Sequence, residues 1–180
     1  MYATSNVWQN TCSNPNFTWS EANDDQTSVS GYYYYWGTSN SGNPTTWTTS
    51  AGYNPGAISS GQTYYLRVKT KDQGGNVSAA KTLFVLKYDK TAPSNPTSVN
   101  PGCTATSNVW QNTCSNPNFS WSGASDSHSG IQGYYYYWGS SSSGNPTSWT
   151  TSASYNPGAI SSGQTYYLTR SMVKSFYLMA

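Results

Sequence analysis

The string Asp126-Ser127-His128-Ser129 contains the three residue types that carry out nucleophilic catalysis in serine hydrolases. In such sites a serine attacks, a histidine takes its proton, and a carboxylate orients the imidazole. Members of a triad come from separate parts of a fold, whereas residues adjacent in sequence rarely converge in that geometry. We therefore interpret this string as an exposed, serine-rich loop. We predict no catalytic residues, and we expect that the protein is not an enzyme.

Carboxylates in the same kind of loop raise the question of a calcium site. Asp24 and Asp25 lie in one loop, and Asp126 lies in an equivalent loop further along the chain. Calcium takes six to eight oxygen ligands, and one or two carboxylates per loop fall well short of that number. Aspartate also forms turns by accepting hydrogen bonds from its own backbone. We predict turn-forming aspartates, with no metal ion and no cofactor.

The loops are equivalent because the chain repeats itself. Residues 5–66 align without a gap with residues 107–168 at a fixed offset of 102, and 49 of the 62 positions are identical. A repeat of this length indicates one module used twice in tandem, and we assign the modules to residues 1–88 and 89–180. Eight of the thirteen differences fall within residues 21–30. Either this loop diversifies recognition or it simply tolerates change.

The cysteines differ between the two copies. Cys103 and Cys114 flank ten residues in the second copy, and they are either joined by a local disulfide or are two buried free thiols. The extracellular character of the composition favours the disulfide. In the first copy, Cys12 matches Cys114, but Met1 stands where its partner would be. We expect Cys12 to be unpaired or available for cross-linking.

Composition limits the class of protein. Of the 180 residues, 8% are charged and 16% are aromatic, and the formal net charge is +2. Few charges and many Thr and Tyr residues favour short strands over surface helices. No basic cluster supports nucleic-acid binding, and no run of 18 apolar residues predicts a membrane span.

The pattern of the elements is that of an antiparallel all-β protein. Residues 63–70 alternate, with Tyr64, Leu66, Val68 and Thr70 on one face. Glycines bracket a second strand at residues 31–37, and a third is predicted at residues 81–88. Shorter strands are expected at residues 16–20 and 45–50. Strands of this number and length, separated by Gly, Pro and Asn turns, are typical of two tandem β-sandwich domains.

Several of these segments carry a family resemblance. They are Phe17-Thr18-Trp19, Gly31-Tyr32, and residues 58–72, 75–78 and 89–93. Together they resemble tandem fibronectin type III modules, which are Ig-like β-sandwiches, of bacterial surface and secreted proteins. The resemblance covers most of residues 16–99 and again residues 118–168. It implies a tyrosine corner at Tyr64, and it says little about function, because this fold serves many roles.

The chain departs from the family pattern at both ends. After Leu168 the second copy no longer follows the first, so its last strand is expected to be missing or altered. The first copy lacks the leading strand that residues 96–99 are expected to give the second. We expect a piece of a longer array, in which the second module has an unpaired sheet edge or a substitute final strand.

The resemblance implies that residues 31–37 and 63–70 are neighbouring strands of one sheet. If Tyr32, Tyr34 and Trp36 face the core, a second set of tyrosines faces outward beside Arg67 and Lys69. This set is a flat aromatic platform for sugar rings or a partner sheet, or a group of cross-strand pairs that only stabilise the sheet. The outward residues are Tyr33, Tyr35 and Tyr65 in the first copy and Tyr135, Tyr137 and Tyr167 in the second.

These observations predict a non-enzymatic, extracellular module that acts as a spacer and adhesive unit on a cell surface or in a secreted protein. The modules would be joined by a Pro-containing linker over residues 87–101. Expected partners are a polysaccharide or another cell-surface ligand, and further copies of the same repeat. Two alternatives stay open. One is a carbohydrate-binding accessory to a secreted glycan-degrading enzyme. The other is a subunit of an extracellular filament, linked through Cys12 or an open sheet edge.

Overall fold

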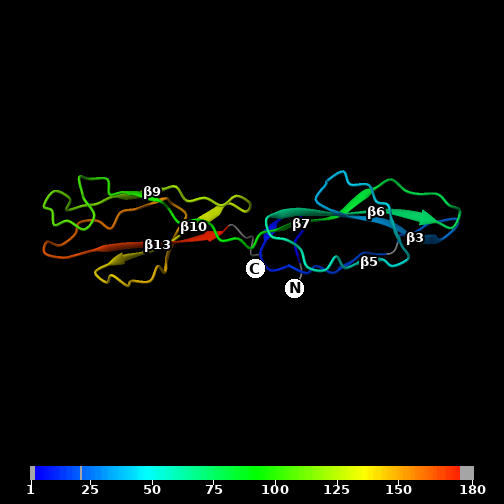
Figure 1. Ribbon diagram of the computed structural model, residues 1–180, viewed down its shortest axis with the longest axis horizontal. Helices are drawn as coiled ribbons and strands as arrows, with labels where there is room; N and C mark the ends of the chain where they lie inside the picture. Colours follow the sequence, from blue (N-terminus) through cyan, green and yellow to red (C-terminus); the bar gives the residue numbers. More distant parts are fainter. Residues whose placement is uncertain (1–2, 21, 175–180) are drawn as a thin grey trace. The chain divides into compact units, whose positions relative to one another are not determined.

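A computed structural model describes residues 3–20 and 22–174 of the chain, and every regular element in that part is a β-strand (Figure 1). The described residues divide into two compact units between Thr91 and Ala92. The first contains β1 (Trp8–Gln9), β2 (Phe17–Thr18), β3 (Val29–Gly37), β4 (Thr46–Thr48), β5 (Gly52–Tyr53), β6 (Gln62–Asp72) and β7 (Lys81–Tyr88). The second contains β8 (Ser98–Asn100), β9 (Phe119–Ser122), β10 (Ile131–Gly139), β11 (Ser148–Thr150), β12 (Ser154–Tyr155) and β13 (Tyr167–Lys174).

The first unit has a five-stranded sheet and a two-stranded sheet. The strand order in the larger sheet is β1-β7-β6-β3-β4, and β2 pairs with β5 in the smaller one. All pairings are antiparallel except that of β1 with β7. The long strands β3 and β6 pair along most of their length, with Tyr34 opposite Val68 and Trp36 opposite Leu66. The pairing of β3 with β6 therefore determines which side chains are neighbours on each face of the sheet.

Aromatic rings fill the space between the two sheets. Tyr32, Leu66 and Val68 are buried on the inner face of β3 and β6, as the alternation predicted. Across from them, the Trp19 ring meets the Tyr32 ring edge-on at 5.6 Å, and Tyr53 lies 4.5 Å from Tyr34. Such ring pairs add to the area that each ring buries. The expected all-β fold is confirmed, with sheets that face each other as in a sandwich.

The second unit repeats this arrangement with two three-stranded sheets, β11-β10-β13 and β12-β9-β8. The register of β10 with β11 and β13 is that of β3 with β4 and β6, shifted by 102 residues. Trp121 is buried and contacts Tyr134 edge-on, as Trp19 contacts Tyr32. Two inward positions differ, because β13 carries Arg170 where β6 carries Val68, and Met172 where β6 carries Thr70.

Some elements differ from the sequence prediction. The strand expected at residues 16–20 is only Phe17–Thr18 in the first unit. The strand β1 was not anticipated, because a two-residue strand leaves no periodic signal. A bulge opposite Leu66 and Arg67 breaks the alternation of β7, so that Leu83 packs against the core. Tyr64, on the same face as Leu66 and Val68, is only half-buried.

The expectation of a linker over residues 87–101 is wrong at both ends of that stretch, and residues 90–97 between them form no regular element. Lys87 and Tyr88 end β7, and the next residue, Asp89, is fully buried. Its carboxylate Oδ1 accepts hydrogen bonds from the Thr91 N–H at 3.0 Å and the Ser60 hydroxyl at 3.4 Å. Residues 98–100 form β8, which pairs with β9. Backbone polar groups that find partners in a sheet are no longer free to act as a flexible connection.

The predicted disulfide between Cys103 and Cys114 is confirmed, with 5.8 Å between the two Cα atoms. It closes a loop that contains Trp110. Cys12 is a free, half-buried thiol, and burial raises its pKa above the ordinary value. A raised pKa lowers the fraction of reactive thiolate at neutral pH, so Cys12 is a poor nucleophile in the folded chain.

Candidate aromatic binding surfaces

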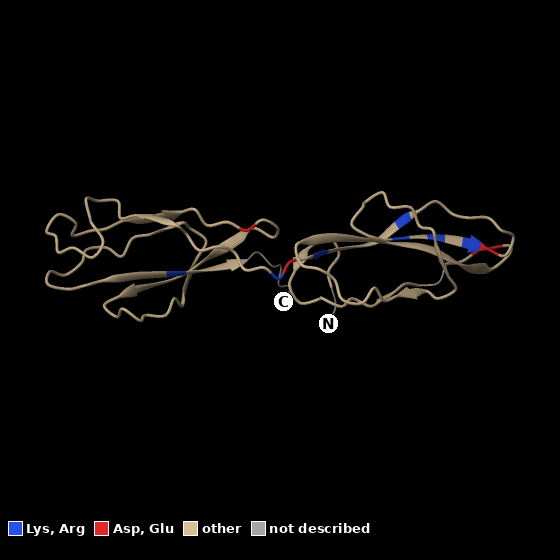
Figure 2. Cartoon of the chain, viewed as in Figure 1, with Lys and Arg blue, Asp and Glu red and all other residues tan. Residues whose placement is uncertain are grey.

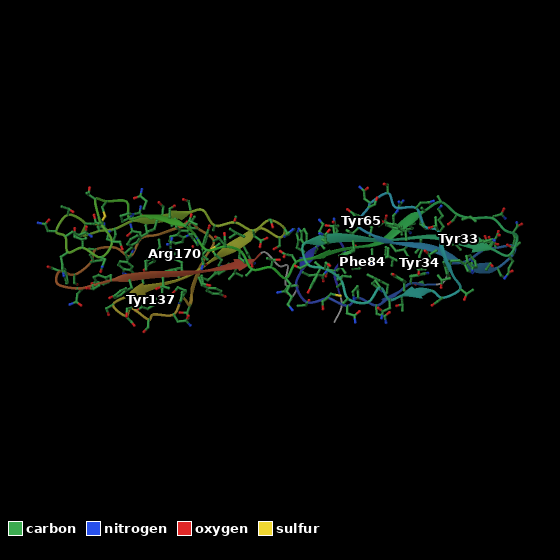
Figure 3. The ribbon with its side chains drawn as sticks, viewed as in Figure 1. Tyr33, Tyr34, Tyr65, Phe84, Tyr137 and Arg170 are labelled. Carbon is green, nitrogen blue, oxygen red and sulfur yellow. A yellow bond between two sulfur atoms is a disulfide. The ribbon has the colours of Figure 1, made fainter. Side chains whose placement is uncertain are left out.

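The outer face of the first unit carries the tyrosines that the sequence placed there. The strand register sets Tyr33 opposite Lys69 on one side and Trp47 on the other, while Tyr35 lies opposite Arg67. Figure 3 shows Tyr33 and Tyr65 on the opposite side of the sheet from Tyr34 and Phe84. This follows from the two-residue period of a strand, which turns successive side chains to opposite faces.

Tyr33 and Trp47 form the open part of this face, here called the Tyr33–Trp47 patch. Their ring centroids are 5.1 Å apart at an interplanar angle of 62°, and 42% of the Trp47 surface is exposed. The indole lies over Gly31, where an added Cβ would stand 2.8 Å from the ring. The Lys71 ammonium lies 5.8 Å from the Trp47 centroid and covers part of this ring. The patch therefore offers an aromatic surface that is already in contact with a cation.

Tyr35 faces the same side but belongs to a different environment. Its hydroxyl accepts a hydrogen bond from the Ser39 N–H at 3.1 Å, and its ring lies against Gly42, where no Cβ would fit. Arg67 Nη1 donates to the Gly42 carbonyl at 2.9 Å, and Lys69 Nζ donates to Asn43 Oδ1 at 2.7 Å. The β3–β4 connection, residues 38–45, is thus fastened over Tyr35. Tyr35, Arg67 and Lys69 therefore hold the loop of residues 38–45 in place.

Tyr65 is separated from the patch along the sheet. It lies opposite Gly37, four residues along β3 from Tyr33. At a rise of roughly 3.3 Å per residue, this places the two positions about 13 Å apart. The three outward tyrosines share one face, as the alternation predicted, but the loop at Tyr35 lies between the other two.

The second unit repeats the patch in a more open form, here called the Tyr135–Trp149 patch. The ring centroids of Tyr135 and Trp149 are 5.1 Å apart, and the two residues are 39% and 41% exposed. Val173 replaces Lys71, so that no ammonium group covers the indole. A shallow, open hollow of about 310 Å³ lies here, lined by Gln132, Tyr135, Trp149 and Val173.

The two remaining tyrosines of the second unit occupy the same places as in the first. The Tyr137 hydroxyl accepts a hydrogen bond from the Ser141 N–H at 3.1 Å, and its ring lies against Gly144. Tyr167 is exposed opposite Gly139. Thr169 and Ser171 stand where Arg67 and Lys69 fasten the loop in the first unit. In Figure 2, the blue segments along β6 mark the basic residues of this strand in the first unit.

Sequence reasoning placed Trp47 and Trp149 in strands but did not include them in the candidate surface. Threonines flank Trp47 on both sides, so residues 45–50 show no apolar–polar alternation that would predict which face of the sheet the Trp47 ring occupies. The missing information was the hairpin register that sets Trp47 opposite Tyr33. A loop of eight residues between two strands does not fix that register from sequence alone.

The loop carboxylates act within their own turns. Asp126 Oδ1 accepts hydrogen bonds from the N–H groups of His128, Ser129 and Gly130 at 2.9–3.1 Å. Asp24 does the same with Gln26 and Thr27, and these hydrogen bonds lower the pKa of its carboxyl group. Within residues 3–20 and 22–174, no three His, Cys, Asp or Glu residues are grouped to hold a metal ion.

Asp72 gives the first unit a testable dependence on pH. Asn76 donates to the Asp72 carboxylate through its side-chain amide at 2.8 Å and its backbone N–H at 2.7 Å, which lowers the pKa of the carboxyl group below 3.8. A lowered folded-state pKa contributes stability above pH 3.8 and loses it as the pH falls through the folded-state value. We expect urea unfolding to show this loss between pH 5 and pH 2. Asp72→Asn should shrink the difference, and an unchanged pH profile in this variant would contradict the assignment.

Comparisons with known proteins identify no family or relative, so a function has to be inferred from the two aromatic patches. No protein-family model matches the chain, and no curated protein matches it at a significant level. In the part of the chain that the structure describes, no helix is long and apolar enough to cross a membrane. What the geometry itself provides is an exposed tyrosine–tryptophan pair that occurs at the same place in both units.

Proposed function

We propose that the chain consists of two fibronectin type III-like modules that serve as a spacer and adhesive unit of an extracellular protein. The observation that carries this proposal is the repetition of one β-sheet unit with an exposed Tyr–Trp patch at the same position in each copy. Repetition suits reach and multivalent binding better than it suits a unique catalytic pocket. Each patch would bind its ligand weakly, and several copies on one chain would together raise the overall affinity.

The strand pairing supports the family. In Ig-like sandwiches, one sheet contains the third, sixth and seventh strands, and the other pairs the second with the fifth. The order β7-β6-β3-β4 together with the pair β2-β5 fits that arrangement. Tyr64 also fits the tyrosine corner, because its hydroxyl exchanges hydrogen bonds with the backbone of Ser59 at 3.0 and 3.3 Å. Tyr166 accepts the equivalent bond from Ser161 at 3.2 Å.

The disulfide and the low charge of the chain support an extracellular location. The Cys103–Cys114 disulfide is of a kind that persists in oxidising compartments and is rare in the cytosol. A chain with 8% charged residues offers few ionic contacts, so its binding would depend little on salt. Both features suit a surface or secreted protein that makes many weak, largely apolar contacts.

A carbohydrate-binding accessory role is the second candidate, and the hollow beside Trp149 favours it. Sugar rings stack their C–H faces on exposed aromatic rings, and Gln132 provides an amide for a hydroxyl group. The edge-on contact between Tyr135 and Trp149 leaves one accessible ring in place of a flat platform. The expected ligand is therefore one sugar unit of a chain at each patch.

Trp149→Ala tests both candidates. We expect it to weaken binding to the relevant polysaccharide or cell surface by about 2- to 10-fold, as expected for one aromatic contact worth roughly 0.5–1.5 kcal/mol. Trp47→Ala is the matched control and should have a smaller effect, because Lys71 already covers that ring. A glycan array followed by a cell-binding assay provides the measurement.

The two assays separate the candidates. Affinity for a defined polysaccharide that Trp149→Ala weakens supports the accessory role, whereas cell binding without glycan affinity supports the adhesive module. The double variant Tyr33→Ser with Tyr35→Ser should lower the melting temperature, because Tyr35 holds the residue 38–45 loop. If both tryptophan variants bind as tightly as the parent chain, the patches only stabilise their sheets and the proposal fails.

A further inference from the structure

The outer face of β6 carries a row of three cations (Figure 2). Alternate positions of this strand turn outward, and they are Arg67, Lys69 and Lys71. Arg67 and Lys69 donate hydrogen bonds to the loop of residues 38–45. Lys71 differs, because its ammonium group lies over the Trp47 ring and donates no hydrogen bond to any residue that the structure describes. The donor groups of Lys71 are therefore available to a ligand beside an exposed aromatic ring.

The second unit has the same aromatic pair without these cations. The corresponding positions of β13 are uncharged, and they are Thr169, Ser171 and Val173. The two tryptophans are equally exposed, 42% for Trp47 and 41% for Trp149, and each lies 5.1 Å from its tyrosine partner. The polar group beside the ring is the Lys71 ammonium in the first unit and the Gln132 amide in the second. The two patches therefore have the same rings and differ in charge.

An ammonium group beside an aromatic ring suits a ligand that combines an apolar ring face with a negative charge. The contact of Lys71 with Trp47 is worth about 0.5–1 kcal/mol at an exposed site, so a ligand can share or replace it at little cost. A carboxylate or sulfate would gain a charge-assisted hydrogen bond from Lys71. A neutral sugar would gain none and would meet an indole that is partly covered. One available cation is too few for a nucleic acid, whose affinity depends on several phosphate contacts.

We propose that the Tyr33–Trp47 patch selects acidic sugars, whereas the Tyr135–Trp149 patch has no preference for charge. This inference rests on the proposed contact of the patches with a polysaccharide, and it adds the chemical class of sugar that each patch takes. In the first unit the sugar ring packs on the indole, and its carboxylate or sulfate accepts a hydrogen bond from Lys71. In the second unit an amide and an aliphatic side chain offer hydrogen bonds and apolar contact to a neutral sugar. One repeated scaffold thus carries two binding specificities.

The test follows the two patches separately in the full chain. The indole N–H groups of Trp47 and Trp149 give separate signals in a proton–nitrogen NMR spectrum, which Trp47→Phe and Trp149→Phe assign. The chain is titrated with oligomers of polygalacturonate and with the same oligomers after methyl esterification, which removes the charge and keeps the sugar ring. We expect the Trp47 signal to report about two- to fivefold tighter binding of the acid, as for one exposed ion pair. The Trp149 signal should report equal binding of both.

Exchanging one residue between the copies should exchange the preference. Lys71→Val gives the first unit the residue of the second, and it should abolish the preference at Trp47, whereas Lys71→Arg should retain it. Val173→Lys should create a preference for the acid of about two- to fivefold at Trp149. Salt at about 0.5 M should reduce the preference of the parent chain, because it screens exposed charges. Melting temperatures establish that each variant is folded.

Two further probes identify the source of the charge. Tighter binding of dextran sulfate than of dextran at Trp47 supports the inference with a sulfate in place of the carboxylate. Equally tight binding of single-stranded DNA would overturn it, because the sugar ring would then contribute nothing. Equal binding of the acid and its ester at Trp47, or a preference that Lys71→Val leaves unchanged, would overturn this inference and leave the proposed sugar contact standing. If neither indole signal responds to any saccharide, both proposals fail.

Discussion

Arg170→Val is expected to stabilise the second unit by about 1–2 kcal/mol. The Arg170 guanidinium lies 5.5 Å from the Trp121 ring centroid, and its Nη1 is buried with no hydrogen-bond partner among the described residues. Burial lowers the pKa of this guanidinium below the usual value. An unsatisfied buried donor costs about 1–3 kcal/mol, more when it is charged, and the contact with Trp121 returns roughly 0.5–2 kcal/mol. Valine removes the cost and supplies the side chain that the first unit uses at this position. Hydrogen exchange of the β10 amides in the full chain measures the local free energy of unfolding.

The reverse substitution is the matched control. Val68→Arg places the same cation in a unit whose corresponding edge is closed by β7, so that the guanidinium has less access to water. We expect a loss of more than about 3 kcal/mol, because overpacking adds to the cost of burying the charge. Comparable effects of opposite sign would show that the site is equivalent in both units. A destabilising Arg170→Val would show that the contact with Trp121 outweighs desolvation.

The sequence predicted the inner face of β6 because residues 63–70 alternate, and Leu66 and Val68 are buried where that alternation requires. Residues 31–37 carry aromatic rings on both faces, so the inward position of Tyr32 was only a conditional expectation, which the structure bears out. The repeat carried the same prediction to the second unit as far as Leu168. Beyond that point the copies diverge, and the inward position of Arg170 became evident only from its register with Tyr136.

The outer face was less predictable because it depends on pairing between distant strands. Alternation turned Tyr33 and Tyr35 outward, but it could not show that residues 38–45 lie over one of them. Nor could it show which face Trp47 occupies, since that follows from a hairpin register. Local patterns specify which side of a strand is apolar, whereas long-range pairing decides which exposed residues become neighbours.

Leu66→Ala and Leu168→Ala are expected to differ in cost although the residues are equivalent in the repeat. Leu66 is 2% exposed on the inner face of β6, which pairs with β7 on one side and β3 on the other, so its truncation should cost about 2–5 kcal/mol through lost burial and a residual cavity. Leu168 is half-buried at an edge strand, and its truncation should cost only about 1 kcal/mol. Hydrogen exchange of β3 and β10 amides in the two full-length variants measures the difference.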